Sequence, residues 1–504
     1  MSIYLIGIGG TGSKCIESLV YLASLGIFGP SPLRVMYVDP DETNGNLERS
    51  RNALNLYQKC YSIMGGVKAD CAWMQTPIES FDIWSPFGDH TAKKELKDCF
   101  HYSTLKSSHP ALGNLFDVLY TKEEREANLD VGFRGRPAIG SAVMSRVDLD
   151  RLDQAPWGQF IESIKADAGG GSRITKVLFC GSIFGGTGAS GLPTLARLLA
   201  NKLEKLNVRD RVQIGAVLTL PYFGFSPPAG QDPNEVYAKS EQFLLNSEAA
   251  LRYYGIQAKG TFDVTYLLGN QTLSRVDFSV GKNSQRNEAH FVELFAALAA
   301  RHFLQYPGEP SNAVIVASRA QPGRLNWMDL PECNVVKPEF VNAARFAYAW
   351  LADISLELAQ ARQVGMDKAR RGAPWLERYF NPNPKREGQL PNLDQVDQQA
   401  AIAIFDDWCS AFLRWIYAVH QCESEAVHLF NTSILGSVNG ELPEALSLKA
   451  DNLPNLVYGD DRDRTRQAQD TMIQLKRNLM AIAPQPPNTG VTGLAKALYL
   501  VCRL

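Results

Sequence analysis

The sequence has few of the features that mark secreted, metal-bound or membrane proteins. Its nine cysteines lie singly along 504 residues without a CxxC pair, which argues against a disulfide framework and against a zinc site. No run approaches the roughly 18 consecutive apolar residues that a membrane-spanning helix needs, so we expect no membrane insertion. The opening MSIYLIGIGGTGSK enters a strand and a glycine loop at once, which leaves no room for a signal peptide. Together these absences are typical of a cytoplasmic protein.

The sequence also has no excess of charge of either sign. It contains 51 Lys and Arg residues and 53 Asp and Glu residues, which gives a net charge of -2. This balance argues against nucleic acid and against an acidic membrane surface as partners. The 45% of hydrophobic residues suffices for buried cores and excludes a largely disordered chain. A length of 504 residues predicts two or three domains.

What the sequence does contain is an alternation of apolar strands with helices. The pattern predicts strands at residues 3–6, 33–38, 176–180, 212–220 and 263–268. Continuous apolar strands that alternate with helices indicate a parallel sheet covered on both faces. Between about 41 and 130 the pattern loosens, which predicts a long and mostly helical insertion. Beyond residue 338 the periodicity is mainly helical.

Two glycine loops carry the strongest chemical signal. Residues 7–12 read GIGGTG and residues 184–191 read FGGTGASG, each between a predicted strand and a predicted helix. In such a loop the backbone N–H groups approach a phosphate closely, and the helix N-terminus adds partial positive charge. Neither loop has the GxxxxGK[ST] spacing of a P-loop, and Lys14 is wrongly spaced to grip a terminal phosphate. Two loops in one sheet therefore predict a nucleotide site built on backbone.

The second loop resembles the GGGTGSG loop that follows the fourth strand in the tubulin/FtsZ superfamily, with Phe184 in place of a glycine and one extra small residue. Four further segments resemble that family in its own order, over a range from residue 3 to residue 306: GFRGRPAIG, AVLTLPYFGF, DVTYLLGNQ and NEAHFVELFAALAARHF. The resemblance implies a tubulin-like GTPase fold, with a parallel Rossmann-like sheet, helices on both faces and a long central helix. We expect a nucleotide-binding domain at 1–285, the central helix at 286–306 and a mainly helical C-terminal region at 307–504.

The resemblance also implies which residues would hold GTP and Mg²⁺. The first loop would contact the α and β phosphates from one side, and the second loop would hold the phosphate chain from the other. A third loop corresponds to the family's γ-phosphate loop, and its arginines stand where the family has small residues, so a guanidinium there would pair with a terminal phosphate. The residues concerned are Gly9, Gly10, Thr11 and Gly12, then Gly185, Gly186, Thr187 and Gly188, then Arg134, Gly135 and Arg136.

Other residues would contact the base and position the reacting water. Asn270 corresponds to the family's base-reading asparagine, and Asn287, preferred to His290, to the second base contact at the start of the central helix. The segment GRLNWMDL at 323–330 resembles the family's catalytic loop, which carries an acid into the pocket of the next subunit. Asp329 and Glu332 are the candidate acids that would position the attacking water. The alternative for this segment is a tryptophan-anchored turn with a capping aspartate.

These features predict a GTP-binding and GTP-hydrolysing protein that self-associates head to tail, with a further protein partner possible through the insertion or the C-terminal helices. One alternative is a nucleotide-dependent scaffold without turnover. Another is an adenylating enzyme of the ubiquitin-activating type, because GIGGTGS followed by VDPDE and NLER resembles its ATP site. Asp39 ends a strand where a dinucleotide fold places its ribose-binding acid. Those enzymes, however, have no second GGTG loop.

Overall fold

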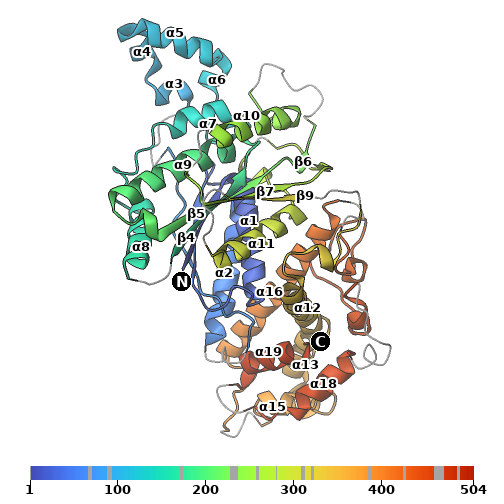
Figure 1. Cartoon of the computed structure of the whole chain (residues 1–504). Coiled ribbons are helices and arrows are strands. Elements are labelled where there is room, and N and C mark those ends of the chain that lie inside the picture. Colours follow the sequence, from blue (N-terminus) through green and yellow to red (C-terminus); the bar gives the residue numbers. More distant parts are fainter. Residues whose placement is uncertain are drawn as a thin grey trace.

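The structure is a computed structural model in which a central sheet lies between layers of helices, with a helical C-terminal region packed against one layer (Figure 1). It describes residues 2–65, 71–87, 94–170, 174–226, 236–256, 260–279, 281–307, 313–318, 323–383, 388–423, 427–458, 470–484 and 488–503. Among these residues, no helix is both long and apolar enough to cross a membrane.

The sheet has seven strands in the order β3-β2-β1-β4-β5-β7-β9, and all neighbouring strands are parallel. The strands are β1 (Ile3–Ile8), β2 (Leu33–Val38), β3 (Ile78–Ser80), β4 (Thr175–Ser182), β5 (Val212–Thr219), β7 (Val264–Gly269) and β9 (Ala313–Ser318). A short second sheet pairs β6 (Phe223–Gly224) with β8 (Ser274–Arg275). The predicted parallel α/β architecture is confirmed.

The position of strand β1 in the sheet explains why its sequence is apolar throughout. Ile3 and Leu5 join one hydrophobic core, whereas Tyr4, Ile6 and Ile8 join another on the opposite face. Since both faces are covered by helices, every side chain of the strand is buried. The helices on the first face are α1 (Gly9–Ser24), α2 (Gly45–Ile63) and α11 (Phe291–Gln305); those on the second are α7 (Pro137–Met144), α8 (Trp157–Gly170), α9 (Gly186–Lys205) and α10 (Phe243–Ile256).

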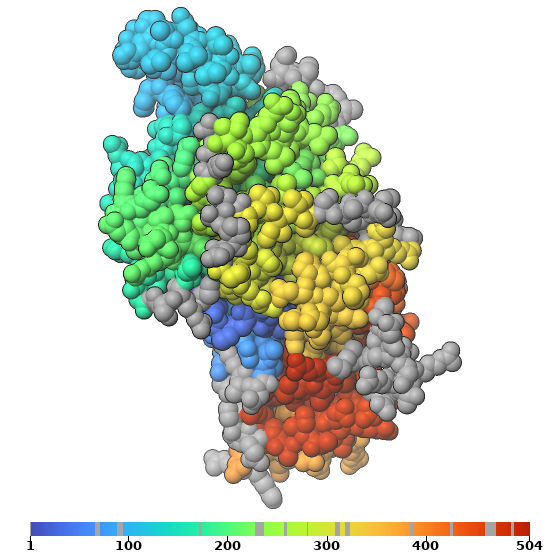
Figure 2. Space-filling model, viewed as in Figure 1, coloured from blue at the N-terminus to red at the C-terminus, as the bar shows by residue number. Residues whose placement is uncertain are grey.

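The insertion is shorter than the sequence predicted. Helix α2 and strand β3 fall within the predicted range of 41–130, yet α2 packs along α1 and β3 extends the sheet. What projects from the body is a lobe of four short helices, seen as the cyan knob in Figure 2. These helices are α3 (Leu96–Cys99), α4 (Tyr102–Ser108), α5 (Pro110–Leu119) and α6 (Lys122–Glu126).

The C-terminal region is mainly helical, as predicted, and it shares one core with the sheet domain. Trp73 is fully buried, with its ring centroid 4.5 Å from that of Phe346 and 5.6 Å from that of Tyr499. Tyr21 stacks on Trp415 at 5.1 Å. The helices are α12 (Cys333–Ala349), the π-helical turn η6 (Trp350–Ile354), α13 (Ser355–Val364), α14 (Met366–Ala369), α15 (Leu376–Tyr379), α16 (Val396–Gln421), α18 (Met472–Ala481) and α19 (Gly490–Val501).

Short 3-10 turns complete the chain: η2 (Arg209–Arg211), η3 (Ser240–Gln242), η4 (Lys282–Ser284), η5 (Trp327–Asp329), η7 (Thr432–Leu435) and η8 (Ala450–Asn455). Three helix boundaries differ from expectation in a way that matters for the site. Helices α1 and α9 begin inside the glycine loops, so the GGTG residues form their first turns. Helix α11 begins at Phe291, so Asn287 lies in the segment before it.

Candidate functional site

A pocket lies at the carboxyl ends of β1 and β4. The strand order changes direction between these two neighbouring strands. From β1 the sheet continues through β2 to β3 on one side, and on the other side it continues from β4. Open parallel sheets bind ligands at such a switch point. The two glycine loops meet there, because a Cβ placed on Gly9 would lie 3.2 Å from Cβ of Thr187. Gly9 has φ of +71°, a conformation that favours glycine.

Both helices that start at the pocket begin without a side-chain cap. The N-cap positions of α1 and α9 are Ile8 and Gly185, and neither makes a side-chain hydrogen bond to the helix. Helix α2 differs, because Asn44 caps it by accepting from the backbone N–H of Asn46 at 2.9 Å. The first N–H groups of α1 and α9 are therefore left for another acceptor. Together with the helix dipoles, they make this pocket suited to an anion such as a phosphate chain.

Most of the predicted phosphate residues line the pocket, namely Gly9, Gly10, Thr11, Gly185, Gly186, Thr187 and Gly188. Gly12 is outside the lining. A Cβ there would come within 2.4 Å of the carbonyl oxygen of Cys180, so this glycine allows α1 to pack closely on β4. The motif therefore combines ligand-facing glycines with a packing glycine, which the sequence alone did not separate.

The third loop brings only part of the predicted set to the pocket. Arg134 and Gly135 line it and Arg136 does not. The Arg134 guanidinium donates from Nε to the carbonyl of Asn128 at 2.9 Å and from Nη1 to that of Val236 at 3.0 Å. It is thus held by backbone carbonyls of two other segments, one before the loop and one before η3. Arg136 donates from Nη1 to Oε1 of Gln242 at 3.2 Å.

Asp39 is a buried carboxyl at the edge of the pocket. Its Oδ1 accepts the backbone N–H of Asp41 at 3.0 Å, whereas its Oδ2 has no hydrogen-bond partner within the described part of the chain. Burial raises the pKa of Asp39 to about 8. Asp41 also lines the pocket, and its Oδ2 accepts the backbone N–H of Lys282 at 2.6 Å. Asp39 therefore presents a neutral or charged oxygen to a ligand, depending on pH.

A cluster of amide side chains forms another wall. The tubulin-like resemblance predicted only Asn287 among them, whereas Asn46 begins the NLER segment of the adenylating alternative. Nδ2 of Asn44 donates to Oε1 of Gln285 at 2.8 Å. Oδ1 of Asn46 accepts the backbone N–H of Asn287 at 2.8 Å. All four line the pocket, and a Cβ on Gly10 would lie 3.2 Å from Nδ2 of Asn46. The signal available in the sequence was the NGN segment at 44–46, directly after VDPDET.

Aromatic rings line the remaining side of the pocket. Phe184 packs against Phe243 and Phe223, with ring centroids at 4.8 and 5.4 Å, and Phe225 and Tyr237 extend this wall. An aromatic wall opposite amide groups suits a flat heterocycle, which stacks on the rings while its edge meets donors and acceptors.

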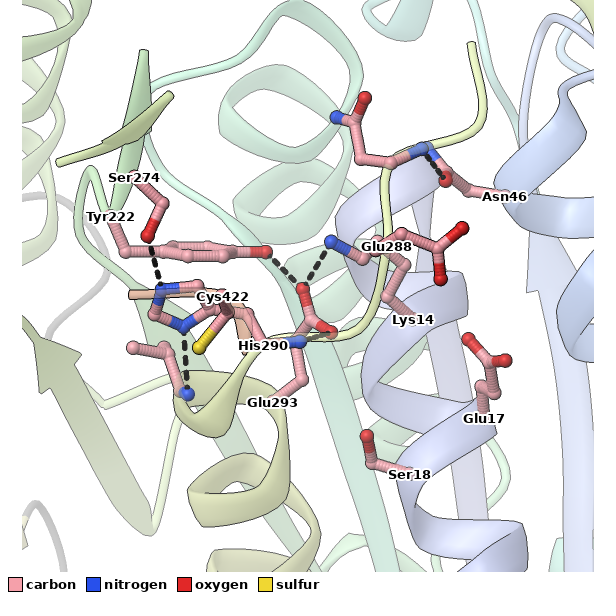
Figure 3. A network of polar contacts seen from close by, with 12 residues as sticks. Lys14, Glu17, Ser18, Asn46, Tyr222, Ser274, Glu288, His290, Glu293 and Cys422 are labelled. Carbon is pink, nitrogen blue, oxygen red and sulfur yellow. Dashed lines mark hydrogen bonds and ion pairs between the residues drawn. The ribbon is translucent and has the colours of Figure 1, made fainter. Parts of the chain in front are cut away.

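Lys14 also lines the pocket, although its spacing did not suggest it. Figure 3 shows its ammonium group directed at Glu293 on α11, with an Nζ–Oε1 distance of 2.6 Å. The hydroxyl of Tyr222 donates to the same oxygen at 2.6 Å. The ion pair is almost fully buried, so Lys14 joins the first turns of α1 to α11. Nearby, His290 caps α11, because its Nδ1 accepts the N–H of Val292 at 3.1 Å.

Three further predicted residues lie outside this pocket, in addition to Gly12 and Arg136. Asn270 donates from Nδ2 to Oε2 of Glu423 at 3.0 Å. Asp329 is exposed and accepts the backbone N–H of Asn326 at 2.6 Å, in a turn anchored by the buried Trp327. Glu332 accepts from Arg301 at 2.9 Å. The geometry at Asp329 is thus that of the capped turn, and neither acid reaches this pocket in its own chain.

The two glycine loops and α11 follow one another in a set order along the chain. One glycine loop follows β1, the other follows β4, and α11 comes after β7 and packs against α1. The chain has a parallel α/β fold, and the order of these parts is the one that the resemblance to the tubulin/FtsZ superfamily implies.

Comparisons with known proteins add little to this assignment. No protein-family model matches the sequence, and no curated protein matches it. Among solved structures the chain is similar to CetZ2 from Haloferax volcanii, described as a GTPγS-bound protofilament, at 16% sequence identity and a TM-score of 0.27. The match covers 60% of this chain and 58% of that chain, so it spans less than two thirds of either.

Proposed function

We propose that this tubulin-like protein binds GTP with Mg²⁺ between its two glycine loops and hydrolyses GTP in head-to-tail assemblies of its own kind. One observation carries the proposal: two uncapped helix N-termini, on adjacent strands at the switch point of the sheet, face a single pocket. A phosphate chain satisfies both sets of N–H groups at once, and both helix dipoles favour its charge.

The triphosphate supplies most of its own metal site in this proposal. In the described ranges, no group of three or more His, Cys, Asp or Glu side chains is arranged to hold a metal ion. Mg²⁺ in nucleotide sites is held by phosphate oxygens, water and one or two carboxylates. Asp39, with its unpartnered Oδ2 in the pocket, fits the role of such a carboxylate or of a partner for a ribose hydroxyl.

The amide cluster supports a purine with both donors and acceptors on its edge. Asn44, Asn46 and Asn287 each carry a carbonyl oxygen and an NH₂ group, and guanine presents both kinds of partner. Their bonds to one another and to Gln285 fix their positions before a ligand arrives. We assign base recognition to this cluster because Asn270 lies outside the pocket.

Hydrolysis requires a group that orients water, and the chain's own pocket receives neither Asp329 nor Glu332. We infer that one of these acids enters the pocket of a second copy. Such a contact is heterologous, so it extends into a filament instead of closing into a dimer. The water-orienting acid then acts only in the assembly.

One residue that the adenylating alternative places at its ATP lies outside the pocket in the structure. Arg49, which that pattern places at the ATP, lies outside the nucleotide pocket and donates from Nε to both carboxylate oxygens of Glu17 at 2.9 and 3.0 Å. Asp39, Asp41 and Asn46 of that pattern do line the pocket, so it is the second glycine loop, which the adenylating enzymes lack, that favours GTP hydrolysis.

Chromatography of the nucleotide retained by the purified protein, followed by calorimetry with GTP and ATP, tests the proposal. We expect GTP or GDP in near-stoichiometric amount and tighter binding of GTP. Absence of bound nucleotide together with no measurable GTP affinity would reject it. Retained ATP with ATP–pyrophosphate exchange would favour adenylation. GTP binding without phosphate release at any protein concentration would favour the scaffold.

A further inference from the structure

A second cavity, of about 740 Å³, lies behind the nucleotide pocket. Helices α1 and α2 form one side, α16 forms another, and the segment from β8 to α11 closes the remainder. Lys14 and Phe223 line both cavities, so they form a shared wall. The volume falls in the range of roughly 300–1,000 Å³ that is usual for small-molecule sites.

Basic side chains outnumber acidic ones around this cavity. Five lining residues are basic and three are acidic: Lys14, Arg49, Arg275, Arg286 and Arg414 against Glu17, Glu288 and Glu441. Because Lys14 is paired with Glu293, an excess of one positive charge remains. The protein as a whole carries a net charge of -2, so this excess is local. A concave surface with basic walls concentrates anions.

Several of these basic groups lack a full set of partners. Arg49 uses Nε for Glu17, but Nη1 and Nη2 are buried and have no hydrogen-bond partner among the described residues. The nearest acid to Nη1 is Glu288, at 3.8 Å. Arg275 and Arg286 are exposed at the cavity, and neither forms an ion pair with another residue in the described ranges. A buried guanidinium edge without acceptors is costly, and a carboxylate or phosphate is the group that matches its two parallel donors.

Part of the cavity lining is apolar, on the same helices that carry Arg49 and Arg414. Helix α2 contributes Ala53 and Leu56, and α16 contributes Ala411 and Ala418. The indole of Trp415 lies among them, with Nε1 directed to Oγ of Ser18 at 3.3 Å. A ligand for this cavity therefore needs an apolar body as well as an acidic group.

We propose that this second cavity binds a small organic anion, with its apolar body against α2 and α16 and its carboxylate, sulfonate or phosphate group on Arg49, Arg275 and Arg286. The site is separate from the nucleotide pocket and does not depend on which nucleotide binds there. Its wall at Lys14 and Phe223 places the anion directly behind the first turn of α1.

The experiment uses the fluorescent anion 1-anilinonaphthalene-8-sulfonate and its uncharged relative N-phenyl-1-naphthylamine, titrated into the full chain. We expect one saturable site for the anion. Ala411→Trp, which fills the cavity from α16, should abolish that site. Arg275→Gln with Arg286→Gln should weaken the anion at least about tenfold and change the uncharged probe less than about twofold.

A matched control removes two charges elsewhere. Arg151 and Arg252 are exposed and line neither cavity, so Arg151→Gln with Arg252→Gln should leave both probes unchanged. The proposal is overturned if anion binding survives both Ala411→Trp and the Arg275/Arg286 change, or if the two probes weaken equally. Should Ala411→Trp fail to fold, the arginine pair, which lies in β8 and in the segment before α11, decides the matter alone.

Discussion

At the scale of single residues, Gly186 is constrained by the loop opposite it. A Cβ at this position would lie 2.9 Å from Cβ of Phe133 and 3.1 Å from its carbonyl oxygen. Gly186→Val should therefore push the second and third loops apart, and overpacking of this kind costs about 1–3 kcal/mol. We expect GTP affinity, measured by calorimetry, to fall at least about tenfold. Gly169→Val is the matched control, because nothing lies within 4 Å of its Cβ position; equal affinities in the two variants would refute the phosphate assignment.

Because the carboxyl of Asp39 is buried, we expect the free energy of unfolding to depend on pH. Burial raises the pKa of its carboxyl to about 8, from an ordinary value of 3.8. Below pH 3.8 the carboxyl is protonated in both the folded and the unfolded protein, and its contribution to the free energy of unfolding is fully present. As the pH rises toward 8, the carboxyl ionises in the unfolded protein first, so this contribution is lost by up to about 1.4 kcal/mol per pH unit. In urea unfolding at pH 5 and pH 8, the wild type should lose stability relative to Asp39→Asn, which does not titrate. Parallel pH profiles for the two proteins would show that the carboxyl has an ordinary pKa.

The amide cluster yields a test of base recognition. Asn46→Ala removes a pocket amide, and an unsatisfied partner costs about 1–3 kcal/mol, so GTP should weaken by roughly ten- to a hundredfold while ATP changes less. Asn270→Ala also removes a hydrogen-bonding asparagine, but outside the pocket. It should leave both affinities unchanged. A larger effect at Asn270 than at Asn46, measured by calorimetry, would restore the assignment that the sequence resemblance suggested.

These residues show where sequence reasoning about the site succeeds and where it stops. That the two glycine loops line one pocket was predictable, because each is a short motif between a strand and a helix. The amide wall was not, because Asn46 meets Asn287 across 241 positions of the chain. Lys14 was set aside on local spacing, and only the folded chain shows Glu293 opposite it. Contacts between distant segments need the tertiary structure.

At the scale of elements, α1 and α11 are joined by the buried pair Lys14 and Glu293. Lys14→Met should destabilise the protein by about 3–5 kcal/mol, since it leaves a charged carboxylate buried without its partner. Lys14→Met with Glu293→Gln should recover most of that loss, as measured by urea unfolding. The exposed pair Arg252 and Glu248 on α10 is the control, and Arg252→Met should cost under about 1 kcal/mol. A Lys14 effect no larger than this would mean that the pair contributes little.

The elements themselves were predictable to different degrees. Residues 33–38 were predicted as a strand with the bounds that β2 has, because a fully buried strand is apolar at every position. Strand β9 was missed, since it lies at the edge of the sheet and exposes Val314 and Val316. Helix α2 was assigned to an insertion because its sequence is polar, yet Leu47, Leu54 and Tyr57 give it a buried face. The local sequence patterns of a weakly amphipathic helix and of an edge strand are too weak for these elements to be predicted.

At the scale of the whole molecule, the C-terminal helices and the sheet domain form one body. Trp73, which precedes β3, is buried among rings of α12, α16 and α19, and a single hydrophobic cluster runs from β1 to α19. This continuity fixes the turn that holds Asp329, because Nε1 of Trp327 donates to the carbonyl of Tyr458 at 2.9 Å. The candidate acid is thus carried by a turn that is anchored to the hydrophobic core. Under the proposed function it meets a nucleotide only in another copy.

The rate of GTP hydrolysis per molecule should therefore rise with protein concentration, above a threshold at which light scattering also rises. Asp329→Asn keeps an oxygen that accepts the N–H of Asn326 and removes only the charge, so binding and assembly should persist while turnover falls about 10²–10⁴-fold, the usual contribution of a positioned acid or base. Glu332→Gln, tested alongside, decides which of the two acids acts. Mixing Asp329→Asn with Gly186→Val, which has an intact acid but a blocked pocket, should restore turnover at the intact pockets. A rate per molecule that stays constant across concentrations, with no recovery on mixing, would mean that each chain acts alone.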